Sequence, residues 1–281
     1  MTEADMPLRD LIVSGRILRP NFVVAVSTAN PNTCRMTVVA ATLPRPLNAH
    51  SEPISRARWA AALVVGAVLA VSADFASQAI PQVVLHLPLE GSTFALVGLL
   101  KVSLGLAALA LGLRIANLRF RDVGLVADGW RRDAMIGLVV AVVYAALQFL
   151  VIIPATGGAS RADIVVESER LGDSLVGVGG FVVLAWTGVF FEELLFRGLF
   201  FHTVWRLLGG SRLAMYVTVA AATLTFAAGH GYQGLPGMID TGLFGGLLLT
   251  LLFVWRGRLT APIVAHAMWN TLAPIGIYLL Y

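Results

Sequence analysis

The fold is decided by residues 175–208, which have the sequence LVGVGGFVVLAWTGVFFEELLFRGLFFHTVWRLL. The first half of this stretch carries no charge, and the whole is longer than the roughly 20 apolar residues that a helix needs to cross a membrane. Similar apolar runs occupy residues 59–80, 93–113, 134–154, 212–230, 238–255 and 262–280. The sequence therefore predicts an all-α, polytopic transmembrane helical bundle of about seven helices.

The composition supports this prediction. Hydrophobic residues make up 58% of the 281 residues and charged residues 13%, whereas a soluble domain is about half apolar and a quarter charged. The excess apolar surface must face something other than water, so soluble folds are excluded and the lipid bilayer is the first expected partner. The formal charge of +4 comes mostly from arginines between the apolar runs, where membrane topology explains them and no nucleic-acid partner is needed.

The arginines alternate along the chain. The even-numbered joins between the apolar runs are basic, whereas the first and fifth joins carry no Lys or Arg and the third, residues 156–174, has more acidic than basic residues. Cytoplasmic loops of membrane proteins are enriched in Lys and Arg. We therefore predict a multi-pass protein of the cell membrane with a cytoplasmic N-terminus. The basic joins contain Arg114, Arg119, Arg121, Arg131 and Arg132, then Arg206 and Arg212, then Arg256 and Arg258.

Residues 1–57 differ from the rest of the chain. They are polar and interrupted by prolines, which predicts a mostly disordered cytoplasmic tail ahead of a transmembrane domain at residues 58–281. Met36 is an alternative start of translation. The run at residues 59–80 follows two arginines and could be a signal peptide, but the many later runs favour an uncleaved first helix. The single cysteine, Cys34, excludes an intrachain disulfide framework and a multi-thiolate metal site.

Adjacent carboxylates interrupt the fourth apolar run at Glu192 and Glu193. Ionisable groups inside membrane segments are costly and therefore functional candidates. Arg197 lies four residues after Glu193 and hence on the same helix face, which predicts an ion pair. Glu192 is farther round the helix from Arg197. We therefore expect Glu192 to be the less constrained carboxylate and a candidate general base.

Polar residues near the ends of two later runs extend the predicted site. Glu192 and His230 lie at similar distances before and after the glycine-rich turn at residues 209–211, so an antiparallel hairpin brings them to one level. His266 and Asn270 are one helical turn apart and share a face. Both lie close to a basic join, and they reach the same level as Glu192 if the hairpin extends beyond the bilayer.

Other polar groups in the apolar runs fit a structural role better. Lys101, Asp74, Asp240 and His202 are expected in helix-packing contacts or near helix ends. Six groups on three helices are costly to bury separately, so Glu192, Glu193, Arg197, His230, His266 and Asn270 are expected to converge on one wet site.

These six residues also carry a family resemblance. The motifs Glu-Glu-x-x-x-Arg at 192–197, Phe-x-x-x-His at 226–230 and His-x-x-x-Asn at 266–270 occur in order. They resemble the three motifs of the CPBP family, which comprises the type II CAAX prenyl endopeptidases and the bacteriocin-processing or immunity (Abi) proteins. The resemblance covers roughly residues 120–280 and implies an intramembrane endopeptidase with a site open to the cytoplasm.

The resemblance also implies roles for single residues. Glu192 and His230 would activate the hydrolytic water, while His266 and Asn270 would stabilise the oxyanion. Glu193 and Arg197 would hold the site in shape. A zinc ion bound by Glu192, His230 and His266 is the alternative, but the chain has no His-Glu-x-x-His helix, and we favour catalysis without a metal cofactor.

Three function classes remain open from the residues alone. An endopeptidase would cleave a hydrophobic or lipidated peptide or protein. A non-catalytic immunity or scaffold protein would bind such a segment without chemistry. A transporter would use the buried charges as a relay, which requires Lys101, Asp74 and Asp240 to line a continuous path. The complete motif set favours the enzyme.

Overall fold

The computed structural model describes residues 22–27, 36–41, 54–171 and 174–281. The chain divides into two compact units, Met1–Arg45 and Pro46–Tyr281. In the first unit, strands β1 (Phe22–Ser27) and β2 (Met36–Ala41) pair antiparallel, with Phe22 opposite Ala41. The prediction of a mostly disordered tail missed this hairpin, whose β-branched residues favour strands. The other residues of the predicted tail up to 53 lie outside the described residues.

The second unit is helical throughout. Among the described residues, seven helical segments are long and apolar enough to cross a membrane, and they coincide with the seven predicted runs. The protein is a multi-pass integral membrane protein, and its membrane unit is an all-α helical bundle, as predicted. Its helices are α2 (Arg56–Ala79), α3 (Thr93–Ile115), α4 (Trp130–Leu147), α5 (Ile153–Ala155), α6 (Ala162–Leu171), α7 (Leu175–Glu193), α8 (Phe201–Leu207), α9 (Arg212–Gly229), α10 (Gly234–Thr241), α11 (Leu249–Arg256) and α12 (Thr260–Leu280).

Wider π-helical turns interrupt three of the spans and end a fourth, and short 3₁₀ turns lie in some of the connections between helices. The π turns are η2 (Ile80–Val84), η4 (Gln148–Ile152), η6 (Leu194–Phe200) and η8 (Gly242–Leu248). The 3₁₀ turns are η3 (Phe120–Val123), η5 (Gly158–Ser160) and η7 (Gly231–Gln233). π turns inside α-helices are often found at functional sites, and η6 starts directly after Glu193.

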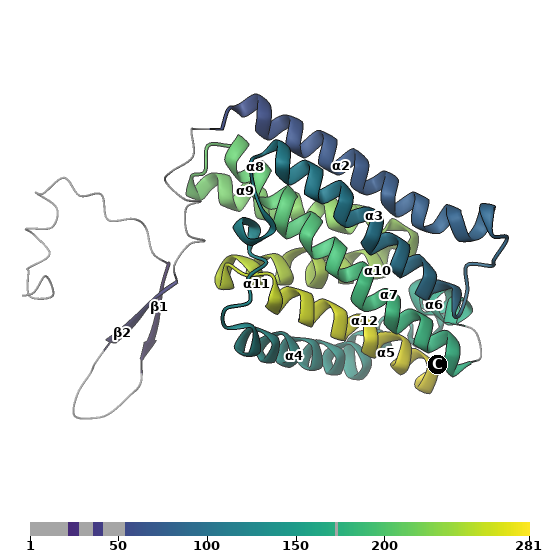
Figure 1. Cartoon of the computed structure of the whole chain (residues 1–281). Helices are drawn as coiled ribbons and strands as arrows, with labels where there is room; N and C mark the ends of the chain where they lie inside the picture. The colour runs from purple at the N-terminus through teal and green to yellow at the C-terminus, as the bar shows by residue number, and fades with distance from the viewer. Residues whose placement is uncertain (1–21, 28–35, 42–53, 172–173) are drawn as a thin grey trace, which may run out of the picture. The chain divides into compact units, whose positions relative to one another are not determined.

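The spans are arranged so that α3 lies between α2 and α7, while α12 lies between α7 and α4 (Figure 1). Many large apolar side chains point outward, among them Val68, Phe75, Leu150 and Leu279. In a membrane these side chains contact lipid, which accounts for the excess of apolar residues in the sequence. The interior of the bundle is mostly apolar as well, but it also contains buried polar residues such as Glu193, Arg197 and His266.

Small residues let α4 and α12 approach closely, which fixes the position of the helix that carries His266. A Cβ atom at Gly137 would lie 2.5 Å from the Ala261 carbonyl oxygen and 2.9 Å from the Ala265 nitrogen. Both are backbone atoms, so neither can move without shifting the helix. Small residues at helix interfaces are the usual basis of tight packing in membranes.

Replacing this glycine is therefore expected to destabilise the bundle. Gly137→Val should lower the thermal stability of the purified protein in detergent, with an overpacking cost of about 1–3 kcal/mol. Gly179→Val is the matched control, because Gly179 is also inside a helix but has no neighbouring atom within 4 Å of an added Cβ. Equal melting temperatures for the two variants would contradict the close approach.

Candidate active site

A cavity of about 250 Å³ lies among α3, α4, α6, α7, α10 and α12. Four of the six predicted site residues line it: Glu192, His230, His266 and Asn270. Glu193 and Arg197 lie behind its wall and are 0% and 1% exposed. The three sequence motifs therefore do meet at one place in the fold.

Glu193 is the centre of a buried hydrogen-bonded group. Its Oε1 accepts from Arg197 Nη1 at 2.9 Å and from His266 Nδ1 at 2.8 Å. The ion pair predicted from the four-residue spacing is thus present. The π turn η6 contains Arg197, whose Nη2 also lies 3.5 Å from the Gly246 carbonyl oxygen in η8. Glu193 therefore links α7, its π turn and α12.

The aromatic ring of Phe226 connects this group to His230. The Arg197 guanidinium lies 5.0 Å from the centre of the Phe226 ring, within the range of a cation–π contact. On α9, the same ring stacks on His230 at 4.7 Å and meets His266 edge-on at 5.8 Å. Phe226 is fully buried and contacts the rings of both His230 and His266, so its packing helps to fix the positions of the two imidazoles.

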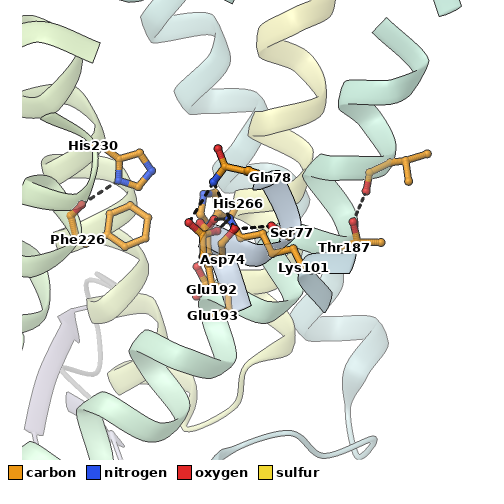
Figure 2. A network of polar contacts seen from close by, with 11 residues as sticks. Asp74, Ser77, Gln78, Lys101, Thr187, Glu192, Glu193, Phe226, His230 and His266 are labelled. Carbon is orange, nitrogen blue, oxygen red and sulfur yellow. Dashed lines mark hydrogen bonds and ion pairs between the residues drawn. The ribbon is translucent and has the colours of Figure 1, made fainter. Parts of the chain in front are cut away.

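Glu192 lines the cavity and is less constrained than the fully buried Glu193, as expected, but it does have a charged partner. Its Oε1 accepts a hydrogen bond from Lys101 Nζ at 2.7 Å, and the same Nζ lies 2.9 Å from Asp74 Oδ1 (Figure 2). Three helices, α2, α3 and α7, each contribute one charge to this chain. Ser77 and Gln78 also contact Asp74, through its backbone carbonyl and its Oδ2 respectively.

The Asp74–Lys101–Glu192 chain corrects one expectation. Lys101 and Asp74 do form a helix-packing contact, as predicted, but Lys101 also lines the cavity and holds the candidate general base. Lys101 is the single lysine of a chain rich in arginine. A lysine supplies a compact point charge on a flexible stem, unlike the planar guanidinium of arginine. A single lysine among many arginines is the sequence signal that could have identified Lys101 as a site residue.

Lys101 is therefore expected to position Glu192. Charge-assisted hydrogen bonds contribute about 1.5–3 kcal/mol, so Lys101→Met should lower kcat for peptide cleavage by about ten-fold or more, with a smaller change in KM. Lys101→Arg should restore part of kcat, because it keeps the charge. A Met variant with the wild-type kcat, or an Arg variant no better than Met, would show that Lys101 only packs the helices.

The hydrogen bond of His230 determines which of its ring nitrogens is left to accept a hydrogen bond. Its Nδ1 lies 2.9 Å from the Phe226 carbonyl oxygen (Figure 2). A carbonyl only accepts, so Nδ1 carries the proton and donates. In the neutral imidazole, Nε2 is then an acceptor. His230 follows the last residue of α9, at the cavity wall.

His266 and Asn270 share one face of α12 and both line the cavity, as predicted. From the sequence, His266 and Asn270 reach the depth of Glu192 only if the helix that carries Glu192 extends beyond the bilayer, and this helix is long enough to do so. The span that carries Glu192 and Glu193 runs for 33 residues, well beyond the roughly 20 that a bilayer requires. Its carboxylates therefore lie at the level of His266, near the start of α12.

A second polar group lies across the cavity from Glu192. Arg161 pairs with Asp163 at 2.5 Å and with Asp240 at 2.8 Å, and both bonds contribute to a raised pKa of Arg161. Asp240, expected near a helix end, thus lines the cavity. On α6, burial raises the pKa of Glu167.

His202 is buried and hydrogen-bonded to the Gly198 carbonyl, in agreement with its expected structural role.

The zinc set considered from the sequence, Glu192, His230 and His266, can be compared with the contacts in the structure. Among the described residues, no three His, Cys, Asp or Glu side chains are grouped so that they could hold a metal ion. Of the zinc set considered from the sequence, Glu192 is bonded to the cation of Lys101, and His266 uses Nδ1 for Glu193. Catalysis without a metal cofactor stays a prediction.

The transporter hypothesis requires a path lined by Lys101, Asp74 and Asp240. Lys101 and Asp240 line the cavity, but Asp74 lies behind Lys101 and outside the lining. No lining residue lies beyond Glu192 on α7 or before His266 on α12. The cavity is thus a closed-ended pocket in the described part of the chain, which suits an enzyme or a binding protein better.

Comparison with known proteins identifies the region that contains the motifs. Residues 174–272 match the family model described as type II CAAX prenyl endopeptidase Rce1-like. This part of the chain is Rce1-like. The match confirms the resemblance to the CPBP family, which is a family of peptide hydrolases. No curated protein and no solved structure matches the chain.

The Rce1-like segment contains all six predicted site residues and covers about a third of the chain. Lys101 and Asp74 lie outside it, on the two helices α2 and α3. Arg161 lies outside as well, whereas its partner Asp240 lies inside. The Rce1-like helices therefore carry the motifs, and the preceding helices add charges that contact them.

Proposed function

We propose that this protein is an intramembrane endopeptidase in which Glu192 and His230 activate a water molecule for attack on a peptide bond. The observation that carries the proposal is the convergence of Glu192, His230, His266 and Asn270 on one closed-ended cavity. Serine, cysteine and paired aspartate nucleophiles are missing from the motifs of the segment, so water is the nucleophile.

In this mechanism Glu192 is the general base. Lys101 occupies its Oε1, and among the described residues no other donor contacts the carboxylate, which leaves Oε2 for water. The water also donates to His230 Nε2. Glu192 takes one proton as the water oxygen bonds to the carbonyl carbon. The carbon–nitrogen bond then breaks as the leaving amine receives that proton, so a carboxylic acid and an amine are released.

His266 and Asn270 stabilise the tetrahedral oxyanion. The Asn270 amide can donate directly. Nδ1 of His266 is used by Glu193, so His266 donates to the oxyanion through Nε2 only as the imidazolium. In this group the carboxylates of Asp74, Glu192 and Glu193 pair with the cations of Lys101 and Arg197. A buried group of charges is tolerated when it is paired in this way.

The substrate is proposed to be a hydrophobic or lipidated peptide segment. Aromatic side chains make up much of the apolar wall of the cavity, and they come from α3, α4, η4, α7, η7, η8 and α12. Such a wall binds apolar side chains, while few convergent polar groups orient the reacting bond. The aromatic lining residues are Phe94, Phe149, Phe181, Phe244 and Trp269 together with Tyr144 and Tyr232.

The test is cleavage of a panel of fluorogenic hydrophobic peptides by the purified protein in detergent. Activity is expected in the wild type and should be unchanged by a chelator such as EDTA. His230→Ala should lower kcat/KM by about 10²-fold or more, the usual effect of removing an acid–base group. Activity that is lost with chelator and restored by zinc would overturn the metal-free mechanism and make these residues ligands.

A non-catalytic binding role uses the same cavity, as in the immunity proteins of the CPBP family. It predicts that the panel binds but is not cleaved. Well-folded wild-type protein that binds a peptide without turnover, with affinity unchanged in His230→Ala, would favour this second function.

A further inference from the structure

The ammonium group of Lys101 lies between two carboxylates, which share it. Its Nζ is 2.7 Å from Glu192 Oε1 and 2.9 Å from Asp74 Oδ1 (Figure 2). The two distances are nearly equal, so neither carboxylate has the cation to itself. When ionised, the three groups carry two negative charges and one positive charge. The strength with which Lys101 binds Glu192 therefore depends on Asp74.

Close helix packing fixes the position of Lys101 between its two partners. Gly98 lies three residues before Lys101 on α3, and a Cβ atom there would lie 2.8 Å from the Leu184 Cα on α7. Farther along α3, a Cβ atom at Gly112 would lie 3.1 Å from the Gly66 Cα on α2. The neighbours are backbone atoms in both cases, so α3 is fixed against both helices. Lys101 is thus held within reach of both carboxylates.

Asp74 lies at the end of this chain of charges that is farther from the cavity. The Gln78 Nε2 donates to Asp74 Oδ2 at 3.4 Å, while Oδ1 faces Lys101. The side chain of Asp74 is 37% exposed, against 15% for Lys101 and 19% for Glu192. Lys101 and Glu192 line the cavity and Asp74 does not. Asp74 can therefore act on the reacting groups only through Lys101.

We propose that Asp74 is a positioning residue of the peptidase site, which sets how much of the Lys101 charge acts on Glu192. This inference deepens the proposed function and rests on it. Lys101 anchors Oε1 of Glu192, and Asp74 directs part of the attraction of the same cation away from Glu192. Without the charge of Asp74, the whole cation acts on Glu192, and a carboxylate with a stronger cationic partner is a weaker general base.

The proposal makes α2 and α3 part of the functional unit. Both helices precede the segment at residues 174–272 that matches the Rce1-like family model. A purely structural ion pair would also join these two helices. The two roles differ in what they predict for catalysis, because a structural pair affects stability whereas a positioning residue affects kcat.

Asp74→Asn tests the proposal in the full chain, purified in detergent. The variant keeps the size of the side chain and an acceptor for Gln78, and it loses only the charge. For the fluorogenic peptide panel, kcat should fall about ten-fold, as expected for one charge a few ångströms from a general base, with KM within about two-fold of the wild type. Asp74→Glu should recover most of kcat, because it keeps the charge. The matched control is Asp128→Asn, an exposed aspartate ahead of α4 that should keep the wild-type rate.

The double variant Asp74→Asn with Lys101→Met decides whether Asp74 acts through Lys101. We expect it to be no slower than Lys101→Met alone, because residues that act through one contact are not additive. Additive losses would overturn the proposal, as would an Asp74→Glu protein no faster than Asp74→Asn.

The wild-type rate separates failure of this inference from failure of the proposed function. Asp74→Asn with a lower melting temperature but the wild-type kcat would leave Asp74 a packing role and reject the inference alone. A folded wild type that cleaves no peptide of the panel would reject the protease, and the inference with it.

Discussion

Glu192→Gln is expected to lower kcat/KM for peptide cleavage by about 10²–10⁴-fold, the usual contribution of a positioned general base. The carboxamide keeps the size of the side chain but cannot take a proton from water. Folding should be preserved, because Lys101 retains Asp74 as its counter-ion at 2.9 Å. The measurement is the initial rate of fluorogenic peptide cleavage in detergent, together with the melting temperature of each variant.

The matched control for this prediction is Glu169→Gln. Glu169 is an exposed glutamate on α6 and does not line the cavity, so its replacement should leave the rate within about two-fold, as for surface changes generally. A Glu192→Gln protein that melts normally and still cleaves at the wild-type rate would remove Glu192 from the mechanism. Equal losses in both variants would point to a general effect of lost negative charge.

Arg197→Met is expected to destabilise the protein by about 3–5 kcal/mol, the cost of leaving one partner of a buried ion pair uncompensated. Glu193 is 0% exposed and Arg197 1% exposed, so water cannot replace the lost guanidinium. Thermal unfolding in detergent should show a large fall in melting temperature. The double variant Arg197→Met with Glu193→Gln should recover much of that loss, because it removes the unpaired charge as well.

Arg212→Met provides the comparison for that experiment. Arg212 is exposed at the start of α9, where loss of one charge is expected to change stability by about 0.5 kcal/mol or less. If Arg197→Met were no less stable than Arg212→Met, the buried pair would not hold the site together. If the double variant were no better than Arg197→Met alone, the packing of the arginine stem would be the cause rather than its charge.

Particular elements show how far the sequence could be interpreted. The Glu193–Arg197 ion pair was predictable because a four-residue spacing places two side chains on one helix face. The shared face of His266 and Asn270 follows from the same periodicity. The seven spans were predictable because lipid demands a continuous apolar run of a minimum length. Each of these rules acts within a single helix, so the order of residues is sufficient to apply it.

The partners of Glu192 could not be predicted in this way. Lys101 lies 91 positions from Glu192 in the chain, and Asp74 comes from a third helix. No local periodicity relates residues on different helices, so the sequence indicated no partner for Glu192 and placed Lys101 among packing contacts. The close approach of α2, α3 and α7 decides which charges meet. The strands β1 and β2 were missed for a similar reason, since pairing depends on the partner strand.

The sequence by itself therefore determined the fold class, the membrane, the family resemblance and the six motif residues, because hydrophobic length and helical spacing are properties of consecutive residues. Only the tertiary structure decided that Lys101 holds Glu192, that Asp240 joins the cavity wall, and that Glu192, His230, His266 and Asn270 line one cavity. Those features depend on how separate helices pack, and packing is set by side-chain volume and charge pairing across the whole bundle.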